Sequence, residues 1–326
     1  MTISLNVRGF PKTYNALNFL KAGSATKTDI IRYAIKVGYP SRNMVIKTLG
    51  KWRPQLLTNM VLGYLDNQLK TIKYFQHLEP SEKTSMSFLL GQAFTLWFAE
   101  QHMGIRHLVH VKGTRKYSLT YGPIGRRKKR ADRPAAKSRP DFVGVEIQKA
   151  GVQYHIFESK GRSGSIGDKL IKKALGQASN VNTINGQKPV TKVAAAFRFS
   201  PIGCSGKIED PDGKDDGWNI TFDLGQALER CYSFFLDDNI MGDGAQARGE
   251  LEVVQFHEYY SYGIDRNILN SLKDRIHIDA PEKFLRLIQS RSQAYEIWRQ
   301  NGILDGVRPE NTSVGLDGMI LFDLSK

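Results

Sequence analysis

The chain has 326 residues, of which 40% are hydrophobic and 24% are charged, so it can bury a core without disulfide or metal staples. Its 47 Lys and Arg residues outnumber its 32 Asp and Glu residues and give a net charge of +15, which favours a polyanionic partner such as nucleic acid. Two cysteines outside any CxxC pair argue against a disulfide framework and against a cysteine zinc site.

The sequence gives no sign of a membrane or secretory segment. The longest near-apolar run, residues 89–99, is shorter than the roughly 20 residues that span a bilayer. The N-terminal residues lack a basic region followed by an apolar stretch, so no signal peptide is expected. We therefore expect a cytoplasmic protein, nuclear if eukaryotic, with no membrane partner.

Residues 1–80 are predicted to form a mainly helical N-terminal region. Capping and turn residues separate four expected helices, at residues 14–21, 27–37, 41–51 and 54–74. The second and third have the spacing of a helix-turn-helix, whose second helix would present Arg42, Asn43 and Lys47 to DNA. A plain packing unit of two helices explains the same spacing equally simply.

A long helix and a strongly basic segment follow. Apolar residues recur at helical spacing over residues 84–102, and a strand is expected at residues 105–111. The segment 106–139 holds twelve basic residues and one acid, Asp132, and its glycines and prolines indicate a partly flexible loop. We expect the densest part of it to contact a phosphate backbone, with a solvated loop or a nuclear-import signal as alternatives. The residues concerned are Arg126, Arg127, Lys128, Lys129, Arg130 and Arg139.

Two strands, a helix and a further strand are predicted next, at residues 141–147, 152–160, 165–180 and 192–199, with a turn at Ala150 and Gly151. This order predicts an α/β domain with a mixed sheet. Beyond it, strands are expected near residues 218–224, 251–259 and 316–322, a helix near 281–299, and a surface loop at 237–249. We therefore divide the chain into an N-terminal region (1–80), a core (81–236) and a C-terminal α/β extension (237–326).

Three residues of the two central strands carry the predicted chemistry. Asp141 begins the first strand, and Glu158 and Lys160 point the same way near the end of the second. A hairpin would bring the start of one strand beside the end of the other, so two carboxylates and an ammonium would converge. Carboxylate oxygens suit Mg²⁺ or Mn²⁺, and a lysine can stabilise the charge that develops during phosphodiester hydrolysis.

The string Pro140-Asp141, followed by Glu158-Ser159-Lys160, resembles the signature of the PD-(D/E)XK nuclease superfamily. The resemblance covers roughly residues 84–199 and implies a restriction-endonuclease-like fold and metal-dependent cleavage. It also implies an acidic metal ligand on the preceding helix, where Glu100 is the acidic candidate and Gln92 the alternative. A Lys or Gln on the following helix would face the site, and Gln177 is preferred to Lys173.

These observations predict a Mg²⁺-dependent nuclease, with DNA as the expected substrate and Asp141, Glu158, Lys160 and Gln177 as its catalytic residues. Asp141, Glu158 and Glu100 are the expected metal ligands. Cutting of both strands would favour a homodimer, and a protein partner is the other association considered. The alternatives are a non-catalytic nucleic-acid-binding protein and a nuclease subunit that only a partner activates, as in a defence, repair or transposition complex.

Overall fold

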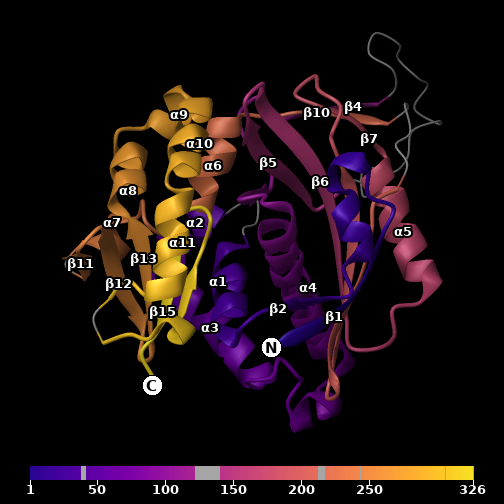
Figure 1. The fold of residues 1–326 in the computed structure, drawn as a ribbon, viewed down its shortest axis with the longest axis horizontal. Helices are drawn as coiled ribbons and strands as arrows, with labels where there is room; N and C mark the ends of the chain where they lie inside the picture. Colours follow the sequence, from indigo (N-terminus) through magenta and orange to yellow (C-terminus); the bar gives the residue numbers. More distant parts are fainter. Residues whose placement is uncertain (38–41, 122–139, 212–216, 243, 305, 326) are drawn as a thin grey trace.

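The computed structural model describes residues 1–37, 42–121, 140–211, 217–242, 244–304 and 306–325, without the side chains of residues 42 and 43. These residues form a mixed α/β fold with three sheets (Figure 1). The α/β class expected from the order of helices and strands is therefore confirmed. The expected restriction-endonuclease-like core is a narrower assignment and is taken up below.

A seven-stranded mixed sheet carries the centre of the fold, in the order β2-β1-β9-β8-β6-β5-β3. β6 is antiparallel to β5 and parallel to β8. Most side chains of β5, β6 and β8 are buried, as expected for strands covered on both faces. The strands are β1 (Thr2–Arg8), β2 (Ala22–Ser24), β3 (His107–Val109), β5 (Phe142–Gln148), β6 (Gly151–Arg162), β8 (Lys192–Ser200) and β9 (Gly203–Glu209).

The first 24 residues differ from the helical region expected there. Ile3, Leu5 and Val7 are buried and alternate with exposed residues, so β1 places one face on the core and pairs with β9. Residues 12–19 form a 3-10 helix, η1 (Lys12–Phe19), in place of the expected α-helix. The helices that follow are α1 (Lys27–Lys36), α2 (Arg42–Leu49), α3 (Trp52–Tyr64) and the short η2 (Lys73–His77). α3 ends ten residues earlier than expected.

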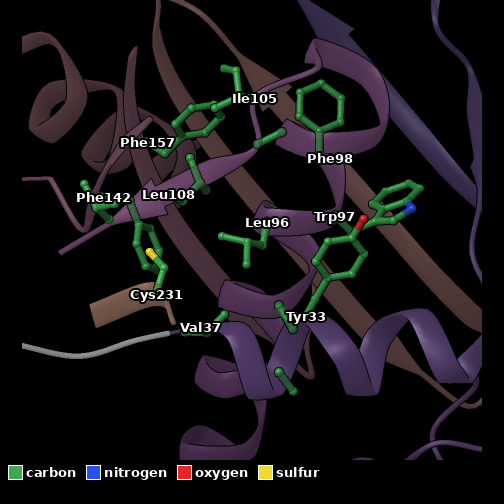
Figure 2. Packing of buried hydrophobic residues seen from close by; sticks show 14 of the residues in the cluster. Tyr33, Val37, Leu96, Trp97, Phe98, Ile105, Leu108, Phe142, Phe157 and Cys231 are labelled. Atoms are coloured by element: carbon green, nitrogen blue, oxygen red, sulfur yellow. The ribbon is translucent and has the colours of Figure 1, made fainter. Parts of the chain in front are cut away.

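Two helices cover the two faces of the sheet. α4 (Pro80–Met103) packs against β6 and β8 on one face, and α5 (Asp168–Ser179) packs against the same strands on the other (Figure 1). Trp97 and Phe98 of α4 join Tyr33 of α1 and Phe157 of β6 in the main hydrophobic core (Figure 2). Both helices appear where the apolar spacing predicts them.

A small second sheet stands beside the central hairpin, in the order β4-β10-β7. Its strands are β4 (Ser118–Tyr121), β7 (Val181–Ile184) and β10 (Trp218–Thr221), and α6 (Leu224–Cys231) follows it. β10 is antiparallel to β4 and parallel to β7. Ile220 of β10 lines the pocket that contains Asp141 and Glu158.

The C-terminal part contains a five-stranded antiparallel sheet in the order β11-β12-β13-β15-β14. The helix expected at residues 281–299 is two helices, because the chain turns at Arg291. The strands are β11 (Ala245–Arg248), β12 (Leu251–His257), β13 (Tyr260–Asp265), β14 (Thr312–Val314) and β15 (Met319–Asp323). The helices are α7 (Asp238–Met241), α8 (Arg266–Lys273), α9 (Ile276–Asp279), α10 (Pro281–Ser290), α11 (Ser292–Asn301) and η5 (Pro309–Asn311).

Among the helices described, none combines the length and the apolar character needed to cross a membrane.

A buried ionic cluster joins helices and turns from distant parts of the chain. The carboxylate of Glu100, on α4, accepts a hydrogen bond from Arg32 Nη2 at 2.9 Å and another from Lys36 Nζ at 2.8 Å. Both donors belong to α1. Lys36 also lies 2.6 Å from Asp317, in the turn between β14 and β15. All four side chains are almost fully buried. α1 and α4 thus connect the seven-stranded sheet to the C-terminal sheet, and they lie between the two in Figure 1.

Candidate active site

The β5–β6 hairpin brings Asp141 to Glu158, as the sequence predicts. The strands pair antiparallel with Phe142 opposite Phe157, and the hairpin turns at Gly151, whose φ of +122° favours glycine. Asp141 directly precedes β5, and its Oδ2 accepts a hydrogen bond from the Ser159 backbone N–H at 3.0 Å. The start of β5 is therefore held against the end of β6.

Glu158 and Lys160 lie on one face of β6, and Ser159 lies on the other. Lys160 Nζ donates to Glu158 Oε1. On the neighbouring β8, Ala194 and Ala196 stand opposite these two residues and pack against α5. The Ser159 hydroxyl instead lies 3.0 Å from the Thr95 hydroxyl of α4. Glu158 and Lys160 therefore face the α5 side, and α4 supports the strand from behind.

Two glycines allow α4 to approach β6 directly after Lys160. A Cβ on Gly161 would lie 1.6 Å from the Ser87 carbonyl oxygen, and one on Gly91 would lie 2.7 Å from the Gly161 nitrogen. No side chain fits in this space, so the helix backbone rests on the strand. This contact fixes the position of the strand end that carries Lys160.

Asp141, Glu158 and Lys160 line one pocket with a volume of about 360 Å³. The small sheet supplies Ile220 of β10, and α5 supplies Gln177. Glu158 Oε2 and Gln177 Oε1 are buried and have no hydrogen-bond partner within the described part of the chain. A buried oxygen without a partner is costly, and both oxygens belong to residues that line this pocket.

The pocket disfavours the charged form of both carboxyl groups. Burial, followed by the charge of Asp141, raises the pKa of Glu158 to about 7, although Lys160 opposes the shift. Burial also raises the pKa of Asp141, against the opposing effects of the Ser159 N–H and Lys160. A cation bound between the two carboxylates would offset both burial penalties.

The donor set fits a hard divalent cation. Two carboxylates and the Gln177 amide oxygen are ligands of the kind that Mg²⁺ takes, usually together with several waters and a substrate phosphate. Over the residues described, no group of three or more His, Cys, Asp and Glu side chains could hold a metal. Asp141, Glu158 and Gln177 are the pocket residues whose oxygens could hold such an ion.

The structure does not place Glu100 at this site, which corrects the ligand set expected from the sequence. Glu100 does not line the pocket, and Arg32 and Lys36 occupy its carboxylate. Burial alone would raise the pKa of Glu100, but these two cations outweigh it and hold the pKa well below its usual range. The alternative, Gln92, is buried on α4 and does not line the pocket either.

The structure describes only some of the residues that were predicted to contact nucleic acid. Residues 126–130 and Arg139 lie outside the described residues, as does the side chain of Arg42. Lys47 is exposed on α2, near the N-terminus of α3, where Trp52 is 75% exposed. Lys47 does not line the pocket.

Three polar pocket residues were not predicted as site residues from the sequence. His110 and Lys112 follow β3, and Tyr117 precedes β4. The His110 ring packs on Phe142, with ring centroids 4.6 Å apart. Lys112 belongs to the basic segment, which was the only sequence signal pointing to it. The pairing of β3 with β5 brings this stretch to Asp141.

No match was found when the chain was compared with known protein families, curated proteins and solved structures. Its function is therefore inferred from the site itself.

Proposed function

We propose that the chain is a metal-dependent nuclease that hydrolyses phosphodiester bonds, with DNA as the expected substrate and a restriction-endonuclease-like core. The observation that supports this most directly is the convergence of Asp141, Glu158 and Lys160 in one pocket, with Glu158 Oε2 buried and unpartnered among the described residues. The order of helix, hairpin, helix and parallel strand around the pocket is compatible with such a core.

Asp141, Glu158 and Gln177 would hold Mg²⁺ or Mn²⁺. When bound, the ion supplies an acidified water and neutralises charge on the reacting phosphate. Asp141 is oriented for this by the Ser159 N–H, and Glu158 is held by β6. Burial of Glu158 excludes bulk water from its carboxylate, which strengthens electrostatic interactions in the pocket.

We expect Lys160 to stabilise the negative charge that develops during cleavage. Its ammonium group contacts Glu158, and its side chain is 23% exposed, so it can reach both the carboxylate and a phosphate at the pocket mouth. As a donor already aimed at the site, it needs little reorganisation when charge develops. Removal of one such donor costs about 10²–10³-fold in rate.

A cleavage assay tests the proposal, with Mg²⁺ or EDTA and with linear, nicked, branched and single-stranded substrates. Cleavage should require the metal and should fall at least about 10²-fold in Asp141→Ala and Lys160→Ala. Lys172→Ala, which removes an exposed lysine of α5, is the matched control. If Asp141→Ala and Lys160→Ala cleave at the wild-type rate, the assigned site is wrong. Binding of nucleic acid without cleavage, alone or with partners, would favour the non-catalytic alternative.

A further inference from the structure

We infer that the pocket admits one unpaired nucleotide, so that the substrate is a single-stranded segment or an unpaired end of DNA or RNA. This rests on the proposed function and specifies its substrate class.

The two carboxylates of the pocket differ in exposure, because Asp141 is partly exposed and Glu158 is not. Glu158 is fully buried, and the pocket is walled on one side by the β5–β6 hairpin and on the other by Ile220 and Tyr117 from the region of the small sheet. Its volume of about 360 Å³ is near the lower end of the roughly 300–1,000 Å³ typical of small-ligand pockets. A pocket of this size suits a single nucleotide rather than a stretch of duplex, so we expect an unpaired strand to enter it.

The walls provide what an unpaired nucleotide requires. Tyr117 and His110 contribute aromatic rings that are partly exposed, and Lys112 and Lys160 contribute positive charge. Rings that stack on bases, together with cations that follow the backbone, are typical of single-strand binding.

Cleavage of matched substrates distinguishes the substrate classes. The set is one oligonucleotide as a single strand, the same sequence as a duplex with covalently closed ends, and that duplex with an unpaired tail, each as DNA and as RNA. The single strand and the tail should be cut at least about tenfold faster than the closed duplex. Equal or faster cleavage of the closed duplex would overturn the inference and leave the proposed nuclease standing.

Variants of Tyr117 test the stacking role. Tyr117→Ala should reduce binding and cleavage of the single strand by about tenfold, and Tyr117→Phe, which keeps the ring, should restore most of that loss. Tyr74→Ala removes an exposed ring of η2 and serves as the control. Lys112→Gln changes an exposed residue and leaves the core intact. It should weaken single-strand binding and reduce by about one the number of counterions released on binding, which is measured from the salt dependence of the affinity. Unchanged single-strand binding in both Tyr117→Ala and Lys112→Gln would refute the inference.

A different experimental result would show that the proposed nuclease function, rather than the single-strand inference, is wrong. If no substrate is cut under any condition, the nuclease assignment fails. Fluorescence anisotropy with the same oligonucleotides in EDTA then still decides the substrate class. Preference for the single strand, lost in Tyr117→Ala, would support the inference, and preference for the closed duplex would reject it.

Discussion

Two groups of charged residues in this protein shift the pKa of their carboxyl groups in opposite directions. In the ionic cluster, Arg32 and Lys36 both contact Glu100 and depress its pKa. In the pocket, Lys160 contacts Glu158 and acts to lower the pKa of both Asp141 and Glu158, but burial outweighs it and raises the pKa of both. A carboxylate that is fully paired holds the fold together, whereas one left short of positive charge is available for a ligand. Burial alone therefore does not distinguish a structural acid from a functional one.

The largest effect on stability is expected at Glu100. Glu100→Gln leaves Arg32 and Lys36 buried without their shared anion, which should lower the free energy of unfolding by about 3–5 kcal/mol. Urea denaturation at pH 7 measures this. Below the melting temperature, the variant should cleave and bind Mg²⁺ like the wild type, because Glu100 lies outside the pocket. Loss of Mg²⁺ binding in the folded variant would instead make Glu100 a ligand.

A substitution of Glu158 is expected to change the free energy of unfolding in the opposite direction. In the metal-free folded protein Glu158 keeps its proton up to about pH 7, against a reference value of 4.5, so folding stability falls as the pH rises between these values. Glu158→Gln abolishes this loss and should raise the free energy of unfolding by about 2–3 kcal/mol at pH 8.5 and by almost nothing at pH 4. Denaturant titrations in EDTA at both pH values test it, with the exposed Glu79→Gln as control. A destabilised variant at pH 8.5 would show that Glu158 resembles Glu100 after all.

Metal binding should supply the pocket carboxylates with the positive charge that Arg32 and Lys36 already provide for Glu100. At a free Mg²⁺ concentration ten times its Kd, the wild type should gain about 1.4 kcal/mol of stability at pH 8. The gain should shrink below pH 7, where the proton on Glu158 competes with the ion. Thermal melts against Mg²⁺ concentration give the measurement. Asp141→Asn and Glu158→Gln should lose the gain, and an equal gain in these two variants would place the ion elsewhere.

The smallest effect is expected at Gln177. Gln177→Ala removes one neutral oxygen from the pocket, a loss worth about 1 kcal/mol or fivefold in cleavage rate at limiting Mg²⁺. The exposed Lys172→Ala, on the same helix, is the comparison. A rate equal to that of this control would mean that Gln177 only lines the pocket.

The predictions that succeeded rest on local patterns. The strands around Asp141 and Glu158, the turn at Gly151 and the helix carrying Gln177 are each specified by residues close in sequence. The convergence of Asp141 with Glu158 followed because a hairpin with a short turn leaves little choice of register.

The predictions that failed depend on distant residues. Glu100 looked like a ligand because nothing in its own helix reveals that Arg32 and Lys36, more than sixty residues earlier, face it. His110 and Tyr117 became pocket residues only through the pairing of β3 with β5 and of β4 with β10. The alternation of Ile3, Leu5 and Val7 was a strand signal that the sequence analysis overlooked.

The first strand also determines when the protein can finish folding. Residues 4–8 of β1 pair in parallel with residues 205–209 of β9, so the two partners are about 200 positions apart in the chain. During synthesis, β1 leaves the ribosome long before β9 exists, and pairings over such separations form slowly. The apolar face of β1 must therefore stay clear of other growing chains until β9 arrives. Completion of the central sheet is in this sense a late step of biosynthesis, although β1 is made long before its partner β9.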